Sequence, residues 1–165
     1  MTFSVAIRQA LSLSIDREVL NQAVFDGLFT PTVQPLPPAS FAHNPELRVP
    51  ARDIARARQL LREAGHERVT IDMQVGNSVV NQQVVQVIQA MAAEAGFDIR
   101  IRATEFATMI RDQNAGNFQA NQVGWSGRPD PDGNTHVFWR TGGGQNDGRY
   151  SNPDVDRLLD AARAT

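Results

Sequence analysis

The sequence contains no cysteine, no long apolar run and no block of like charge. The missing cysteine excludes disulfides, thiolate zinc sites and cysteine nucleophiles, and it leaves the compartment open. No apolar stretch approaches the roughly 20 residues of a membrane-spanning helix, and residues 1–4 lack the basic and apolar regions of a signal peptide. The 16 basic residues are scattered arginines and the net charge is −2, so neither a nucleic-acid groove nor a membrane surface is indicated. We therefore expect a soluble polypeptide whose partner is small or neutral.

The length and the composition predict one domain. With 165 residues, 41% of them hydrophobic, the chain can bury one sizeable core but is too short for two comfortable domains. We therefore interpret residues 1–165 as a single domain.

Apolar periodicity predicts an α/β protein with a small mixed sheet and flanking helices. Two helices are expected over 5–28 with Asp16 as the cap between them, and both Gly65 and Gly96 follow predicted helices as terminating residues. Strand, helix and strand over residues 69–103 form a predicted βαβ unit, in which Asp72 is expected to pair with Arg100. Further helices are expected over residues 53–64, 79–95, 106–113, 134–139 and from 153 onward. Val80 is expected on the buried stripe of the 79–95 helix. Strands are expected over residues 69–75, 97–103 and 119–124.

Residues 30–50 contain six prolines, a density that removes amide donors and fixes φ. Neither a helix nor a central strand can persist there, so we expect an extended crossing loop. Its use stays open between a surface connection and a functional segment, because loops of this length in compact domains are often functional.

The segment from Gly124 to Gly133 gathers an indole, a cation and two carboxylates immediately after a predicted strand. Loops placed by a rigid scaffold commonly carry function, and ligands of open α/β sheets bind outside the strand ends. Trp125 offers a broad apolar wall, and Arg128 offers a planar fork that matches a carboxylate. Two structural alternatives stay open: Trp125 could be core, and Arg128 could pair internally with Asp130 or Asp132.

Ser126 lies in a sequence that superficially resembles a hydrolase nucleophile elbow. Arg128 stands where that motif needs its second glycine, and Pro129 and Pro131 follow in place of a helix. The only downstream histidine is His136. A small serine hydrolase using Ser126 is therefore an alternative, as is an interaction module without a ligand.

Metal and cofactor chemistry is not indicated. Asp130 and Asp132 are two residues apart in a proline-rich turn, a position more typical of turn capping than of calcium ligation. His43, His66 and His136 have no metal-binding spacing. We expect no metal and no cofactor.

Several segments together resemble the extracellular solute-binding proteins of ABC importers, family 5, which include dipeptide-, oligopeptide-, glutathione- and nickel-binding members. Their order and spacing over nearly the whole chain make the combination specific. The matching segments are Arg8 to Arg17, Asp53 to Gly65, Gly124-Trp125-Ser126-Gly127 with Asp130-Pro131-Asp132, and Tyr150 to Asp156. The resemblance implies a periplasmic-binding-protein-like lobe, and this chain would be a fragment covering most of the second of two lobes.

The resemblance also implies a non-catalytic receptor that closes on a peptide or similar small solute and delivers it to an ABC permease. The parent would be periplasmic or extracellular and would meet the membrane only through the permease, with no nucleic-acid partner. The implied ligand-binding residues are Trp125, Ser126, Gly127, Arg128 and Asp130. In dipeptide- and oligopeptide-binding relatives, an aspartate three residues after the tryptophan pairs with the peptide amino terminus. Arg128 reverses that charge, so we expect it to meet a carboxylate or another electron-rich group.

Overall fold

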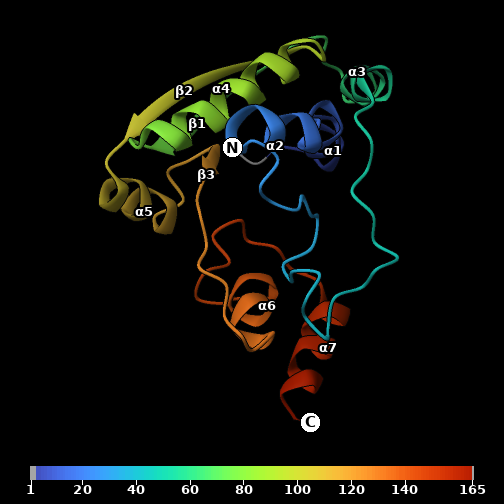
Figure 1. Ribbon diagram of the computed structural model, residues 1–165, viewed down its shortest axis with the longest axis vertical. Helices are drawn as coiled ribbons and strands as arrows, with labels where there is room; N and C mark the ends of the chain where they lie inside the picture. The colour runs from blue at the N-terminus through green and yellow to red at the C-terminus, as the bar shows by residue number, and fades with distance from the viewer. Residues whose placement is uncertain (1–2, 165) are drawn as a thin grey trace. The chain divides into compact units, whose positions relative to one another are not determined.

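The computed structural model describes residues 3–164, in which three helices precede β1, strands and helices alternate from β1 to β3, and two helices follow (Figure 1). The elements are α1 (Val5–Ser14), α2 (Arg17–Phe25), α3 (Ile54–Glu63), β1 (Val69–Gly76), α4 (Val79–Ala93), β2 (Phe97–Thr104), α5 (Phe106–Asn114), β3 (Ala120–Gln122), α6 (Asp132–Trp139) and α7 (Pro153–Arg163). No described helix combines the length and the apolar character needed to cross a bilayer.

The three described strands form one sheet in the order β2-β1-β3. Val69 of β1 is in register with Phe97 of β2, and Met73 is in register with Ala120 of β3; both pairings are parallel. The α/β class and the βαβ unit are confirmed, but the described sheet is parallel and not mixed. The reason is connectivity: α4 precedes β2 and α5 precedes β3, so each crossover returns the chain to the same end of the sheet.

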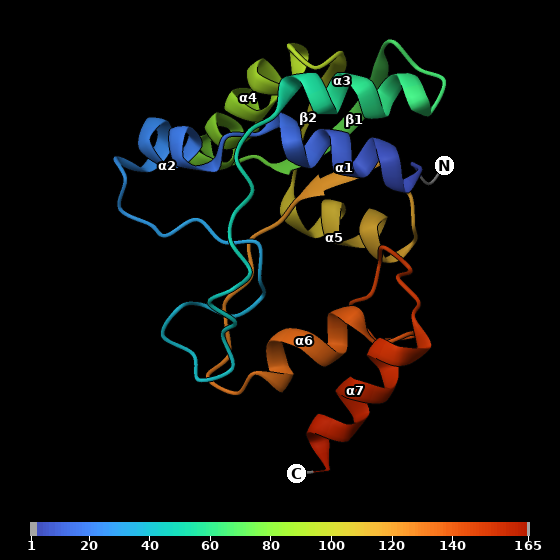
Figure 2. The same cartoon turned by 90° about the vertical axis from the view of Figure 1, so that its right-hand side faces the viewer.

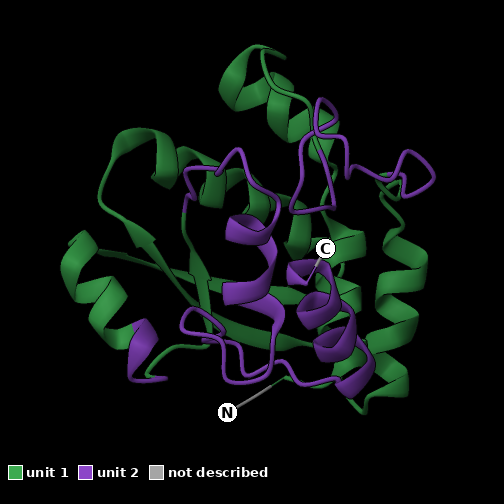
Figure 3. Ribbon diagram, turned by 90° about the horizontal axis from the view of Figure 1, so that it is seen from below, with its two compact units in different colours: residues 1–31, 49–112, 117–123 green, residues 32–48, 113–116, 124–165 purple. Residues whose placement is uncertain are grey.

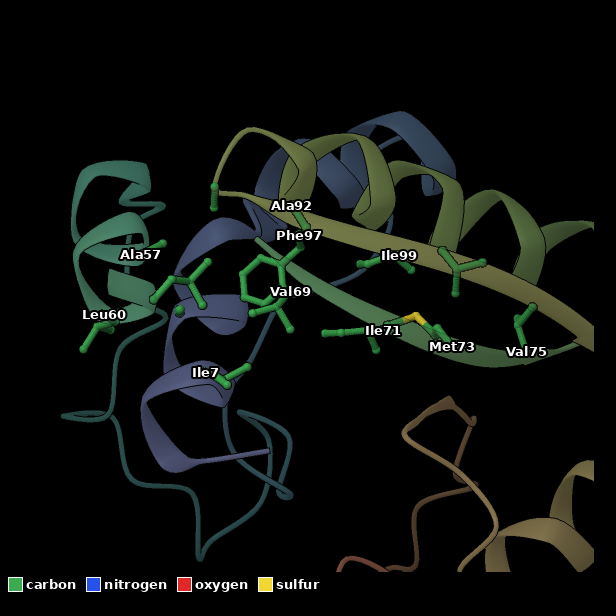
Figure 4. Packing of buried hydrophobic residues seen from close by; sticks show 14 residues of the cluster. Ile7, Ala57, Leu60, Val69, Ile71, Met73, Val75, Ala92, Phe97 and Ile99 are labelled. Carbon is green, nitrogen blue, oxygen red and sulfur yellow. The ribbon is translucent and has the colours of Figure 1, made fainter. Parts of the chain in front are cut away.

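One face of β1 forms the centre of the main hydrophobic core. Val69, Ile71, Met73 and Val75 alternate along the strand and are all buried, and Figure 4 shows them in a row along β1, with Ile7 of α1 near the Val69 end. Further buried apolar side chains of this core come from α1, α3, α4 and β2, and they include Ala10, Ala57, Leu60, Leu61, Val85, Ala92, Phe97 and Ile99. The apolar face expected from the alternation of residues 69–75 is therefore buried. The other face is not open to water throughout, because Gln74 is only 2% exposed and donates a hydrogen bond to the Asp112 carboxylate.

Two side-chain expectations in this region are wrong. In α4 the buried residues are Val85 and Ala92, whereas Val80 is exposed, because α4 carries apolar residues on two adjacent stripes and the sheet covers only one of them. Arg100 Nε lies 3.8 Å from a carboxylate oxygen of Asp98, two residues away on the same strand, and forms no ion pair with Asp72 within the described residues.

Local sequence signals account for the helix ends. The Asp16 carboxylate accepts hydrogen bonds from the amides of Glu18 and Val19, as predicted for the cap of α2. Gly65 and Gly96 follow α3 and α4 with φ of +82° and +107°, a conformation that L-residues rarely adopt. In Figure 2, α1 lies directly beneath α3, and Ala10 and Ala57, both fully buried, let the two helices pack closely.

The described chain divides into two compact units (Figure 3). The first comprises the residues up to Pro31, Val49–Asp112 and Asn117–Val123; the second comprises Thr32–Arg48, Gln113–Gly116 and the residues from Gly124 onward. The sheet and its core belong to the first unit, and the 124–133 loop, α6, α7 and most of the proline-rich segment belong to the second. That residues 1–165 fold as a single domain stays a prediction.

Candidate functional site

Asn134, in the first turn of α6, holds the 124–133 loop together. Its side-chain oxygen accepts hydrogen bonds from Trp125 Nε1 at 3.0 Å and from the Arg128 amide at 2.7 Å. Its side-chain nitrogen donates to the carbonyl oxygens of Arg128 at 2.7 Å and Asp130 at 3.2 Å. Asn134 is only 4% exposed, so these bonds are shielded from water. One buried amide therefore sets the positions of three of the predicted site residues.

Asn134 is not among the site residues predicted from the sequence. Asparagine side chains often bond to nearby backbone groups in turns, and this one directly follows the Asp130-Pro131-Asp132-Gly133 turn. An asparagine directly after such a turn was therefore the sequence signal that could have indicated its role. That its side chain bonds groups four to nine residues back along the chain could not be seen in the sequence.

Trp125 packs one side of its ring and leaves much of the rest uncovered. Its ring lies edge-to-face against Phe138 of α6, with the ring centroids 4.9 Å apart, and the residue is 44% exposed. The reading of Trp125 as core is therefore wrong. The guanidinium carbon of Arg128 lies 4.7 Å from the Trp125 ring centroid, within cation–π distance.

Arg128 is held in place by uncharged groups. Its Nη1 donates to the Ser126 carbonyl oxygen at 2.8 Å, and its side chain crosses so close to Gly133 that a Cβ there would lie 2.9 Å from Arg128 Cγ. No carboxylate of residues 3–164 forms an ion pair with Arg128. Asp132 pairs instead with Arg163 at 2.7 Å. The structural alternative in which Arg128 pairs internally with Asp130 or Asp132 is therefore wrong. A fixed guanidinium without a carboxylate partner can bind one from solution.

Of the other predicted site residues, Asp130 forms hydrogen bonds that shape the turn, whereas Gly127 has open space beside it. The Asp130 carboxylate accepts a hydrogen bond from the Asp132 amide at 2.9 Å, and the Asp130 carbonyl accepts one from Gly133. The closest atom to a Cβ placed on Gly127 would be Asn134 Oδ1 at 3.8 Å, so the protein itself does not require glycine there. The Ser126 hydroxyl forms no hydrogen bond within the described chain.

The hydrolase alternative gains no support from this geometry. His136 Nε2 lies 3.1 Å from a carboxylate oxygen of Asp160, which also binds Arg140. Within the described residues, His136 forms no hydrogen bond with the Ser126 hydroxyl. A serine nucleophile needs a base within hydrogen-bond reach. Among residues 3–164, no three or more potential ligand side chains are grouped to hold a metal ion.

Charged contacts join α6 to α7. Arg140 donates to both oxygens of Asp160, at 2.8 and 3.0 Å. This bidentate hydrogen bond, with a smaller contribution from His136, lowers the pKa of the Asp160 carboxyl to about 2. The hydrogen bonds from Arg163 likewise lower the pKa of Asp132. Ionised Asp160 and Asp132 therefore stabilise the packing of the two helices.

Removing the Asp160 charge is expected to change acid stability. Its pKa in the folded protein lies below the roughly 3.9 of an unfolded aspartate, so its stabilisation is complete above about pH 4 and is lost as the pH falls towards the folded value. Asp160→Asn should lower the free energy of unfolding at neutral pH and flatten its dependence on pH in the acid range. Urea unfolding at a series of pH values measures both effects.

The matched control is Asp154→Asn. Asp154 lies on the same helix, its side chain is 87% exposed, and it approaches Arg157 only to 3.9 Å. The free energy of unfolding of Asp154→Asn should equal that of the natural protein at every pH. If Asp160→Asn lost stability in parallel with the natural protein down to the lowest pH, the assigned role of Asp160 would be wrong.

Comparisons with known proteins relate this chain to solute-binding proteins. The family model described as bacterial extracellular solute-binding proteins, family 5 Middle, matches residues 1–146. The chain is 32% identical to di/tripeptide-binding protein 4 of Pseudomonas aeruginosa, over 89% of this chain and 30% of that protein. It is 30% identical to heme-binding protein A of Haemophilus influenzae, over 96% of this chain and 31% of that protein. The chain thus spans less than a third of the length of these curated relatives.

Solved structures share the fold. HbpA2 from Haemophilus parasuis superimposes with a TM-score of 0.88 at 28% identity, covering 96% of this chain and 33% of that one. The periplasmic binding protein DppA from Helicobacter pylori, in complex with the peptide STSA, gives a TM-score of 0.90 at 23% identity, covering 97% of this chain and 32% of that one. Because DppA is only 23% identical to this chain, its similarity shows the fold alone.

Proposed function

Because the chain belongs to the bacterial extracellular solute-binding proteins of family 5, we propose that it forms part of a receptor that captures a carboxylate-bearing small solute for an ABC importer. The family membership confirms the resemblance predicted from the sequence. Relatives are named for peptides in one case and for heme in another, so the family alone does not select the ligand. The choice of a carboxylate depends on one observation: the Arg128 guanidinium is held by the Ser126 carbonyl and forms no ion pair with a carboxylate of residues 3–164.

The chemistry of the loop supports this choice. Arg128 is always charged, and its planar fork can donate two parallel hydrogen bonds to a carboxylate. One of its nitrogens is held by the Ser126 carbonyl, and the Trp125 ring lies within cation–π distance. The guanidinium is thus oriented by neutral groups that do not cancel its charge.

The neighbouring residues have supporting roles in this proposal. The exposed part of the Trp125 ring forms an apolar wall of the site, and the Ser126 hydroxyl hydrogen-bonds the ligand. Gly127 lets the ligand approach the backbone, and Asp130 fixes the turn through its bond to the Asp132 amide. No step of covalent chemistry is needed, and the function is binding and release.

The wider setting belongs to the same proposal. We propose that this chain contributes most of one lobe of a two-lobed periplasmic or extracellular receptor, which closes on its ligand by hinge motion and delivers it to a membrane permease. This is supported by the share of the relatives' length that the chain spans.

Arg128→Gln in the receptor that contains this chain tests the proposal. Calorimetry is run with di- and tripeptides and with their carboxy-terminal amides. We expect the substitution to weaken binding of free-carboxylate ligands by about 10- to 100-fold, the effect of losing a charge-assisted hydrogen bond. Amidated ligands should bind weakly to both proteins, with no further loss on substitution.

Arg157→Gln serves as the control, because Arg157 is a surface arginine of α7 whose side chain is 69% exposed. It should leave every affinity unchanged. Unchanged affinity of Arg128→Gln for every anion that the natural receptor binds would rule out the proposed role of Arg128.

A further inference from the structure

The proline-rich segment is an ordered structure and not a loose connection. The Gln34 side chain donates to the carbonyl oxygens of Asn44 at 2.7 Å and Leu47 at 3.3 Å, and it accepts from the Asn44 amide at 3.0 Å. His43 Nδ1 lies 3.0 Å from the carbonyl oxygen of Leu36, which is itself 8% exposed. These bonds close residues 34–47 on themselves and fix the shape of the segment.

This fixed segment presents an uncovered aromatic ring. Phe41 is 90% exposed, although it follows directly on a turn closed by the bond from the Ser40 amide to the Pro37 carbonyl. A phenylalanine left in water on an ordered loop contributes nothing to the core. It offers apolar area that a bound group could cover.

A hollow lies between this segment and Arg128. It has a volume of about 270 Å³, and its lining residues all belong to the second unit. Most of the lining residues are apolar, with Arg128 and Ser40 as the polar members, a mixture typical of ligand sites. The lining residues are Leu36, Pro37, Ala39, Ser40, Phe41, Arg128 and Pro129. Complete ligand pockets are usually larger than this, so the hollow suits one side group of a ligand.

We infer that this hollow is a subsite for an aromatic ring whose molecule also places a carboxylate on Arg128. The inference rests on the proposed function, because it places the carboxylate on the same guanidinium. Phe41 and the rings of Pro37 and Pro129 provide apolar surfaces for the ring, and Arg128 lines the same hollow. The proline-rich segment, whose use the sequence leaves open, thus acquires a role in ligand selection.

Phenylacetate and acetate are the probes that test the subsite, titrated at millimolar concentration into the isotope-labelled chain. The amide resonances of Ser40, Phe41 and Arg128 are followed by NMR. We expect phenylacetate to shift all three and to bind about tenfold more tightly than acetate, because its ring becomes covered. Acetate should shift mainly Arg128.

Phe41→Ala should reduce phenylacetate affinity to that of acetate without changing acetate binding, and its high exposure leaves folding intact. Leu47→Ala is the control, since Leu47 is an exposed apolar residue of the same segment that does not line the hollow. Equal affinities of phenylacetate and acetate in the natural chain, or a ring preference that survives Phe41→Ala, would overturn the inference. Neither result bears on the peptide calorimetry with Arg128→Gln, so the two proposals can fail separately.

Discussion

Gly96→Ala is expected to destabilise the chain by roughly 2–5 kcal/mol. Gly96 has φ of +107°, and a Cβ built on it would lie 2.6 Å from the carbonyl oxygen of Glu67. The new methyl group would meet backbone, so no flexible side chain can move aside. The carbonyl of Gly96 also accepts the Val69 amide at the start of β1, so the shift would be transmitted to the sheet. Denaturant unfolding followed by circular dichroism measures the loss.

Gly65→Ala is a matched control for this prediction. Gly65 also follows a helix with positive φ, of +82°, but nothing lies within 4 Å of a Cβ built on it. Its substitution should cost only the backbone conformational term, about 1 kcal/mol. Equal losses for the two variants would show that the contact with Glu67 has no energetic effect.

Asn134→Ala is expected to cost roughly 2–4 kcal/mol and to displace Trp125. The substitution removes four hydrogen bonds and leaves the Arg128 amide and two carbonyl groups to find other partners. The indole N–H of Trp125 would lose its acceptor, so its NMR resonance should move to the position of a water-exposed indole. Any ligand affinity that depends on Arg128 should fall with it.

Asn146→Ala is the control for Asn134. Asn146 organises the following loop in the same way, donating to the carbonyls of Arg140 and Tyr150 and accepting from the Tyr150 amide. Its substitution should also destabilise the second unit but leave the Trp125 resonance in place. A cost for Asn134→Ala no larger than that of an ordinary surface substitution, about 0.5 kcal/mol, would contradict the role given to Asn134.

The sequence was a sufficient guide wherever a structural feature depended on neighbouring residues. The cap at Asp16 and the glycines after α3 and α4 follow from local backbone chemistry, and the buried apolar face of β1 follows from the alternation of its residues. The burial of Gln74 on the other face could not be predicted from that alternation. The buried face of α4 could not be chosen in the same way. Its adjacent valines offer two apolar stripes, and only packing against the sheet decides between them.

The same distinction between local features and contacts of distant segments applies to the candidate site. Trp125 and Arg128 could be selected because their chemistry is unusual for a loop. The hollow beside them could not be predicted, because its other wall is far away in the sequence. The composition of that segment indicates only that it is irregular. The parallel direction of β3 also depends on a crossover whose path the sequence does not specify.

The hydrogen bonds of Asn134 have a thermodynamic consequence for recognition. Immobilising a long side chain on binding costs about 0.5–1.5 kcal/mol in conformational entropy. Here the Trp125 ring and the Arg128 backbone are already tied to one buried amide. Their freedom is lost when the chain folds and not when a ligand arrives. The loop is therefore preorganised, and in the proposed site a larger part of the free energy of each ligand contact would contribute to affinity.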